Sequence, residues 1–194
     1  RGIIKIMWAL VQNNEISEVF KNPKPITIGD VNYPSNIFSV WSSDDLEGIG
    51  IYEVVEDNTN LKDSDYYVNT NQSFTFADDT VTASYGTATA KDLDDSGSGE
   101  DLIPGLKTIH KKIIDDQAYS LLQSNDWLVI RNQEAGTAIP SDWSTYRTNV
   151  RSTAATMKGL IDDVSDVDGL AALYVYSGDP ATRPLGEWPT PPSS

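Results

Sequence analysis

The first half of the chain alternates short apolar runs with turn-forming residues, a pattern typical of β-hairpins. The runs IMWALVQ and EISEVF flank Asn13-Asn14, and PITI and VNY flank Gly29-Asp30. IYEVVE and three later runs continue the pattern, with Asp78-Asp79 as a third turn signal. Asn, Asp and Gly accept the positive φ angles of tight hairpin turns. Residues 1–91 are therefore predicted to form a small antiparallel β domain.

One helical turn is expected inside this domain, because Ser42 or Ser43 can cap a short helix that runs through Leu46 and ends at Gly48 or Gly50. Residues 1–11 are basic and then apolar, as in a signal peptide. The apolar stretch is short, Lys5 interrupts it and no small-residue cleavage site follows, so we expect no signal peptide. No run approaches the ~18 apolar residues of a membrane span.

In the second half, over residues 105–176, apolar residues recur at helical spacing. The first helix is expected to bury a line formed by Leu106, Ile109, Ile113, Ala118 and Leu121 and to carry Lys107, Lys111 and Lys112 outside. The longest helix is expected to open at Pro140 and Ser141 and to carry an apolar line of Trp143, Tyr146, Val150, Ala154, Met157 and Ile161.

Three polar or small residues indicate where the shorter helices begin and end. Asn125 can cap a helix that Gly136 ends, and Asp166 can cap a last helix. Between the two halves, residues 92–104 read as an acidic Gly/Ser linker, and residues 177–194 read as a proline-rich extended tail. The sequence thus predicts an α+β chain: a small antiparallel β domain with a short helix, then a helical hairpin or bundle.

Acidic residues outnumber basic ones by 29 to 14, which gives a net charge of −15. This charge argues against nonspecific binding to nucleic acid or to anionic membranes, since both need a basic surface. It favours protein partners, although an acidic balance also serves solubility alone. The chain has no cysteine, which excludes disulfides and thiolate zinc sites.

No catalytic motif stands out. The single histidine, His110, lies among lysines on an amphipathic helix, where a solvated surface position explains it better than a general base or a metal ligand. The chain has no nucleophile elbow and no Gly-rich phosphate loop before a helix. We therefore expect no enzyme activity and no cofactor.

The acidic segment partly matches a calcium-binding EF-hand loop. Counted from Asp92, three further residues fall at ligand positions and one glycine falls at the required turn: Asp94, Ser96, Glu100 and Gly97. The twelfth position, where a bidentate glutamate is needed, is Ile103. No helix is expected before Asp92, so a solvated linker is the better interpretation.

The stretch from Asn125 to Arg151 concentrates aromatic and arginine side chains. Its candidate residues are Asp126, Trp127, Arg131, Glu134, Trp143, Tyr146, Arg147 and Arg151. Trp127 and Trp143 can form the seam of a helical hairpin, with Arg131 reaching Asp126 or Glu134. The alternative is a patch that binds a partner protein, because aromatic residues and arginine are enriched at interface hot spots.

The same stretch resembles a family. LLQSNDWLVIRNQEAGTAIPSDWSTYRTNVRS is similar to a recurring pattern of bacteriophage tail-fibre assembly and tail assembly chaperone-like proteins. The matching positions are Leu121, Leu122, Asp126, Trp127, Arg131, Glu134, Gly136, Pro140, Tyr146, Arg147 and Arg151. Asn125 stands where the pattern has Thr or Ser. The opening from Met7 and the final EWPTPP also resemble short tail-associated phage proteins.

The resemblance implies a non-enzymatic phage protein that contacts other tail or fibre proteins, with a homo-oligomer as one arrangement. As a structural part of the tail, baseplate, neck or fibre attachment it would reside in the virion. As an assembly chaperone it would act in the infected host cytoplasm and be absent from the virion. The β domain in front of the helical motif favours the structural role. A host-facing carbohydrate-binding module is the other alternative, in which Trp41, Tyr66, Tyr67 and Trp188 would stack on sugars unless they serve core packing.

Overall fold

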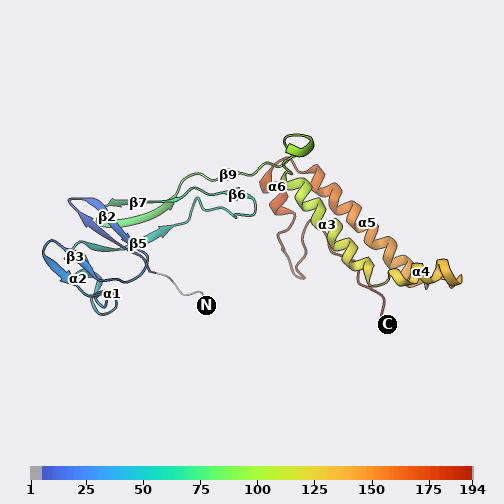
Figure 1. Cartoon of the computed structure of the whole chain (residues 1–194), viewed down its shortest axis with the longest axis horizontal. Helices are drawn as coiled ribbons and strands as arrows, with labels where there is room; N and C mark the ends of the chain where they lie inside the picture. Colours follow the sequence, from blue (N-terminus) through green and yellow to red (C-terminus); the bar gives the residue numbers. More distant parts are fainter. Residues whose placement is uncertain (1–5, 194) are drawn as a thin grey trace. The chain divides into compact units, whose positions relative to one another are not determined.

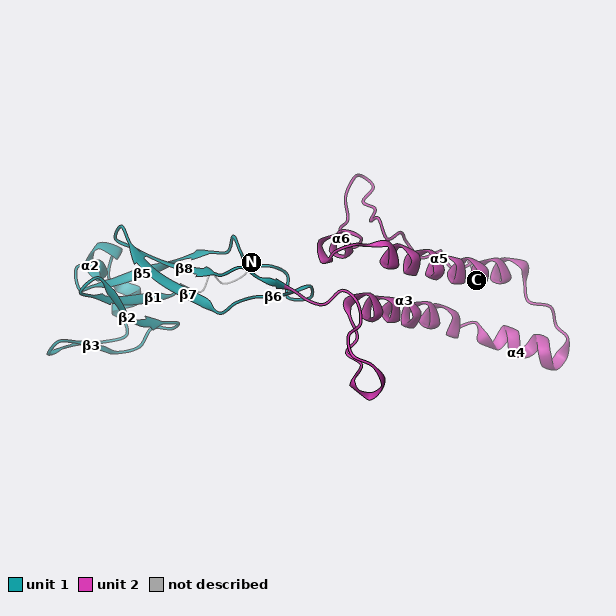
Figure 2. Ribbon diagram, turned by 90° about the horizontal axis from the view of Figure 1, so that it is seen from above, with its two compact units in different colours: residues 1–89 teal, residues 90–194 magenta. Residues whose placement is uncertain are grey.

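The computed structural model describes residues 6–193, so Lys5 and the rest of residues 1–5 lie outside it. The chain forms two compact units, residues 1–89 and residues 90–194 (Figures 1 and 2). The first unit consists mainly of strands and the second of helices, so the mixed α and β content expected from the sequence is present, in the expected order.

A five-stranded sheet with the order β2-β1-β5-β8-β7 organises the first unit. Its strands are β1 (Trp8–Gln12), β2 (Glu15–Phe20), β5 (Ile51–Asp57), β7 (Gln72–Ala77) and β8 (Thr80–Tyr85). Two smaller pairs join β3 (Ile26–Ile28) to β4 (Val31–Tyr33) and β6 (Tyr67–Val68) to β9 (Thr89–Ala90). The two edge strands, β2 and β7, contact each other, which shows that the sheet is curled.

Strand β1 supplies residues to two separate cores, because successive side chains of a strand point to opposite faces. Trp8 and Leu10 enter one core, which α1 (Ile37–Val40), α2 (Ser43–Glu47) and the β3–β4 hairpin cover. Ala9 and Val11 enter the other, together with Met7, Val54, Val81 and Ala83. Strand β1 is therefore buried on both faces.

The turn signals place the hairpins correctly. Asn13, Asn14, Asp78 and Asp79 all have positive φ, and Gly29 opens the β3–β4 turn at φ 59°. The sheet is mostly antiparallel, as expected, but one pair departs from this arrangement, because β5 and β8 run parallel. The β5–β8 pair is formed across the long segment that contains β6 and β7, and local turn chemistry carries no information about it.

Helix α2 begins as the sequence predicts. The Ser42 hydroxyl accepts a hydrogen bond from the Asp45 amide, and the Asp45 carboxylate accepts one from the Ser42 amide, which completes a capping box. The Ser42 hydroxyl also donates to the Asp45 carboxylate at 2.6 Å, and this bond, followed by that from the Ser42 amide, holds the pKa of the Asp45 carboxyl below its ordinary value. Helix α1 was not expected, although it brings Ile37 and Phe38 into the core.

The second unit contains α3 (Leu106–Gln123), α4 (Asp126–Ala135), α5 (Ser141–Asp163) and α6 (Val167–Ala172), after a 3-10 turn, η1 (Gly99–Asp101). Gly136 ends α4 at φ 67°, and Asp166 caps α6 by accepting from the Gly169 amide, both as predicted. The predicted apolar line of α5 is buried from Tyr146 to Ile161, while Trp143 is half-buried.

Helix α3 packs against α5, but not with the face that the sequence suggested. Leu106 and Ile114 are buried, whereas Ile109 and Ile113 are 44% and 41% exposed. Lys111, expected on the outer face, pairs instead with Asp162 of α5 at 2.6 Å, and Lys158 pairs with Asp115 at 2.6 Å. From Lys111 to Asp115 the chain advances four residues along α3, while their partners on α5 go back four residues, from Asp162 to Lys158. The two helices therefore run antiparallel.

The acidic segment before α3 folds back on itself. Ser96 and Ile103 exchange backbone hydrogen bonds of 3.0 and 2.8 Å, and the amide of Gly105 donates to the Asp95 carboxylate at 2.8 Å. A Cβ on Gly105 would lie 2.4 Å from backbone atoms of Asp94, so the segment crosses the start of α3 at close range. The structure therefore ties residues 92–104 to the helical unit through specific hydrogen bonds.

The proline-rich segment lies along the helices. Leu185 is 1% exposed and its amide donates to the carbonyl of Leu173 at 3.0 Å, while Trp188 Nε1 donates to Gln117 of α3 at 3.0 Å. A hollow of about 370 Å³ separates Pro189 and Pro192 from the first turns of α5. Among residues 6–193, no helix is long and apolar enough to cross a membrane.

Candidate interaction site on α4 and α5

The centre of the candidate site is the guanidinium of Arg147, which projects from α5 to the junction of α3 and α4. Its Nη2 donates to the Asp126 carboxylate at 2.8 Å, and its Nη1 donates to the carbonyl of Leu122 at 3.2 Å and to Asn125 Oδ1. The side chain is 8% exposed, whereas that of Asp126 is 47% exposed. Arg147 therefore adds a donor to one carbonyl oxygen at the end of α3 and holds the first turn of α4 through Asp126.

Asn125 has a different role from the helix cap expected for it. Its side chain makes no capping hydrogen bond to α4. It is instead 2% exposed, donates from Nδ2 to the carbonyl of Leu121 at 3.1 Å, and accepts from Arg147. Both ends of the amide are thereby paired, as a buried polar group requires. Sequence reasoning missed this partner of Arg147, since an Asn before a helix normally signals a cap.

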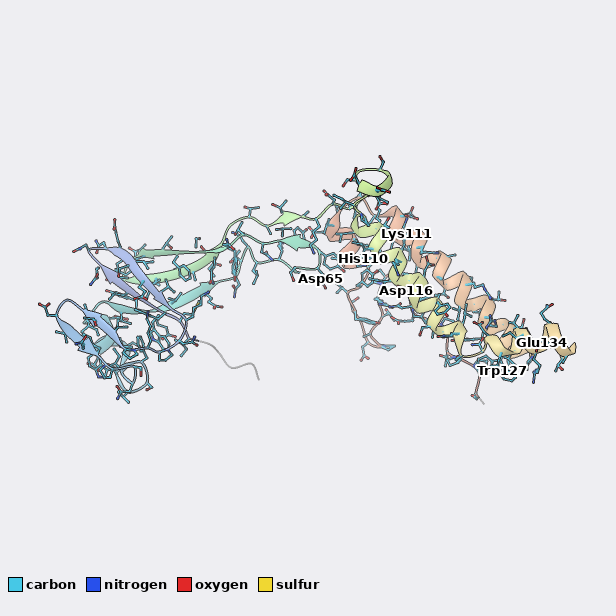
Figure 3. All side chains as sticks on the ribbon, in the orientation of Figure 1. Asp65, His110, Lys111, Asp116, Trp127 and Glu134 are labelled. Carbon is cyan, nitrogen blue, oxygen red and sulfur yellow. The ribbon has the colours of Figure 1, made fainter. Side chains whose placement is uncertain are left out.

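The other half of the motif faces outward. Trp127 is 55% exposed and Ile130 is 56% exposed, so the expected burial of Trp127 in a helical seam is wrong. Arg131 lies over the Trp127 ring, with its Cζ 4.8 Å from the ring centroid. This stacking replaces the expected reach to Asp126 or Glu134. Figure 3 shows Trp127 near the start of α4 and Glu134 near its end.

Trp143 and Tyr146 meet on α5, one turn apart. Their ring centroids are 5.8 Å apart with the planes at 90°, an edge-on arrangement favoured by aromatic quadrupoles. Tyr146 is 4% exposed and belongs to the packed face of α5. Arg151 is exposed and donates to the carbonyl of Arg147 at 3.3 Å. The structure thus divides the candidate residues into a buried clamp and an exposed face.

His110 is engaged within the helical unit. Its Nδ1 lies 2.7 Å from the hydroxyl of Tyr174, and the two rings are in contact with centroids 5.0 Å apart. The solvated surface position expected for it is therefore wrong, because the residue is half-buried. Among residues 6–193, no group of three or more His, Cys, Asp or Glu side chains is arranged to hold a metal ion.

The side chains of the Asn125–Arg151 motif thus fall into two groups, one that contacts α3 and one that is exposed to solvent. Comparison of the chain with protein-family models, curated proteins and solved structures finds no match.

Proposed function

We propose that the chain is a non-enzymatic structural protein associated with a bacteriophage tail, at the tail, baseplate, neck or fibre attachment, and that it acts through contacts with other tail or fibre proteins. The observation that supports this proposal most is the division of the Asn125–Arg151 motif. Arg147 anchors α4 from inside, while Trp127 and Ile130 are presented outward on the anchored helix, and the half-buried Arg131 lies over the Trp127 ring. An aromatic and arginine surface on a rigid backing has the composition of an interaction hot spot.

In this proposal, the helices of residues 105–176 form a helical hairpin that carries this surface. The antiparallel pairs Lys111–Asp162 and Lys158–Asp115 fix the relative positions of α3 and α5 along their axes. Exposed ion pairs add little free energy, so their role is alignment more than stability. The buried line of α5 supplies the stability of the arrangement.

Mass spectrometry of purified virions tests the proposal. If the protein is structural, its peptides are present in mature particles of the phage that encodes it, in proportion to other tail proteins. Peptides present in infected lysate but absent from purified particles would favour the assembly chaperone instead. The separate β unit also favours a structural protein, because a minimal chaperone does not need one.

A carbohydrate-binding role is the second candidate, and one hollow on the first unit favours it. The hollow has a volume of about 470 Å³ and is lined by Trp41, Asp44, Asp45, Gly48 and Ile49. Trp41 is 37% exposed and its ring is in edge-on contact with Tyr33, which holds it as a platform. Trp188, by contrast, is half-buried and hydrogen-bonded to Gln117. A glycan array with wild-type protein and a Trp41→Ala control decides whether this hollow binds sugars.

A further inference from the structure

The exposed face of α4 has the spacing of a helix that packs against another helix. Trp127, Ile130, Arg131 and Glu134 stand at positions i, i+3, i+4 and i+7, which share one side of an α-helix. Of the residues of α4, only Leu128 is fully buried, so most of this helix is available for contact. The first two residues of the face are apolar and more than half exposed.

This face lies in a stretch without net charge, although the chain as a whole is strongly acidic. Between Ser124 and Arg151 the three arginines balance Asp126, Glu134 and Asp142, so all of the net charge of −15 belongs to the remaining residues. Two copies of the chain repel each other over most of their surfaces. Because this stretch carries no net charge, two copies can approach each other through α4 without net electrostatic repulsion from it.

The charges within the face are also complementary to themselves. In an antiparallel pair of α4 helices, with a two-fold axis between Ile130 and Arg131, Trp127 of one copy lies opposite Glu134 of the other. The guanidinium of Arg131 already sits over the Trp127 ring. Glu134 therefore faces Arg131 of the second copy, and the symmetry forms this ion pair twice.

We infer that α4 forms a two-fold contact between two copies of this chain, with Ile130 next to the two-fold axis and with Trp127 and the Arg131–Glu134 pairs on either side. This inference deepens the proposed function and rests on its assignment of α4 as a contact surface. The contact links the subunits into a symmetric unit before other tail proteins bind. One ten-residue helix from each copy covers less area than a standard stable interface, so the dimer is a weak one.

Analytical ultracentrifugation of the full-length protein, from about 1 µM to about 500 µM, tests the contact. We expect a reversible monomer–dimer equilibrium in this range. Ile130→Lys removes the apolar centre, places a lysine opposite Arg131 of the second copy and leaves a monomer. Arg131→Glu places like charges opposite each other and weakens association at least about tenfold, as does Glu134→Arg. An equimolar mixture of these two single variants restores a dimer, because each then faces its complement.

Val55→Lys is the matched control, since Val55 is 54% exposed and belongs to the first unit. Its dimerisation is expected to equal that of wild type, and circular dichroism confirms that every variant is folded. A wild-type protein that stays monomeric throughout overturns the inference, and so does a mixture of the two charge variants that fails to associate. Absence from virions would reject the proposed function and leave this solution equilibrium unaltered, so the two failures are distinguishable.

Discussion

Arg147 and Asp126 are joined by a 2.8 Å ion pair across 21 residues of chain, and the arginine is the more deeply buried partner. The pair connects the long helix α5 to the first turn of α4. Its geometry makes the arginine an organising residue, since one guanidinium also serves the Leu122 carbonyl and Asn125.

Replacing Arg147 with alanine is expected to destabilise the protein by about 2–3 kcal/mol. The main cause is Asn125 Oδ1, a buried acceptor that loses its donor, while the half-exposed Asp126 contributes little. Urea denaturation of the full-length chain measures the change. Arg151→Ala is the control, and it should stay within about 0.5 kcal/mol of wild type because Arg151 is exposed. Equal effects of the two substitutions would reject the clamp.

The two aromatic residues of the motif are expected to respond differently to truncation. Trp127→Ala should lower the free energy of unfolding by less than about 1 kcal/mol at dilute concentration, because the side chain is 55% exposed. Tyr146→Ala should lower it by about 3–5 kcal/mol, the range for a buried large aromatic. Chemical unfolding of both variants provides the comparison. A large loss for Trp127→Ala would restore the helical seam that the sequence suggested.

Alanine substitutions at two glycines are expected to change the stability of the protein in opposite directions. A Cβ on Gly50 would lie 2.7 Å from the carbonyl oxygen of Val11, and its φ is +84°, so Gly50→Ala should cost about 2–3 kcal/mol. Gly159 lies inside α5 with no neighbour within 4 Å of such a Cβ. Gly159→Ala should stabilise the protein by about 0.5–1 kcal/mol. Thermal unfolding measures both effects. A Gly50→Ala variant more stable than wild type would contradict the close contact between Gly50 and the carbonyl oxygen of Val11.

Asp95 predicts a pH dependence of stability. The hydrogen bond from the Gly105 amide, then that with Thr108 and the charge of Lys111, hold the pKa of the Asp95 carboxyl below its ordinary value of 3.8. Its stabilising contribution is therefore complete above the unfolded pKa and is lost as pH falls through the lower folded pKa. Asp95→Ala should be less stable than wild type at neutral pH, and the difference should shrink well below the folded pKa, where the protonated carboxyl keeps only neutral hydrogen bonds.

NMR titration of the side-chain carboxyl measures that pKa directly, and urea melts at neutral pH and near about pH 2 measure the stability difference. Asp95→Asn is the useful control, since its amide oxygen still accepts from Gly105 without carrying charge. A difference between wild type and Asp95→Ala that does not change with pH would show that the charge is irrelevant.

Local features of the structure could be predicted because their causes are local. Asn13-Asn14 and Asp78-Asp79 form turns through their own φ angles, and Ser42 and Asp166 cap helices through atoms within three residues. The parallel pairing of β5 with β8 depends on chain topology, which no short pattern encodes.

Helix α3 shows why the candidate site was harder to predict. It has two apolar lines, and only contact with α5 determines that Ile114 is buried while Ile113 remains exposed. Similarly, nothing next to Asn125 in sequence indicates that Arg147 will reach it from α5. The aromatic composition of the motif was visible in the sequence, but whether each ring faces inward or outward is a property of the packed helices.

Strand β1 shows how the first unit can select its own pairing. In most sheets, a shift of one residue in the pairing register moves apolar side chains from the core to solvent and polar ones into the core, which is unfavourable. Here both faces are apolar, so the shift would exchange bulky Trp8 and Leu10 for small Ala9 and Val11. One core would become overfilled and the other would be left with voids. The alignment of this strand is thus chosen by the volume of its side chains, with their polarity contributing almost nothing.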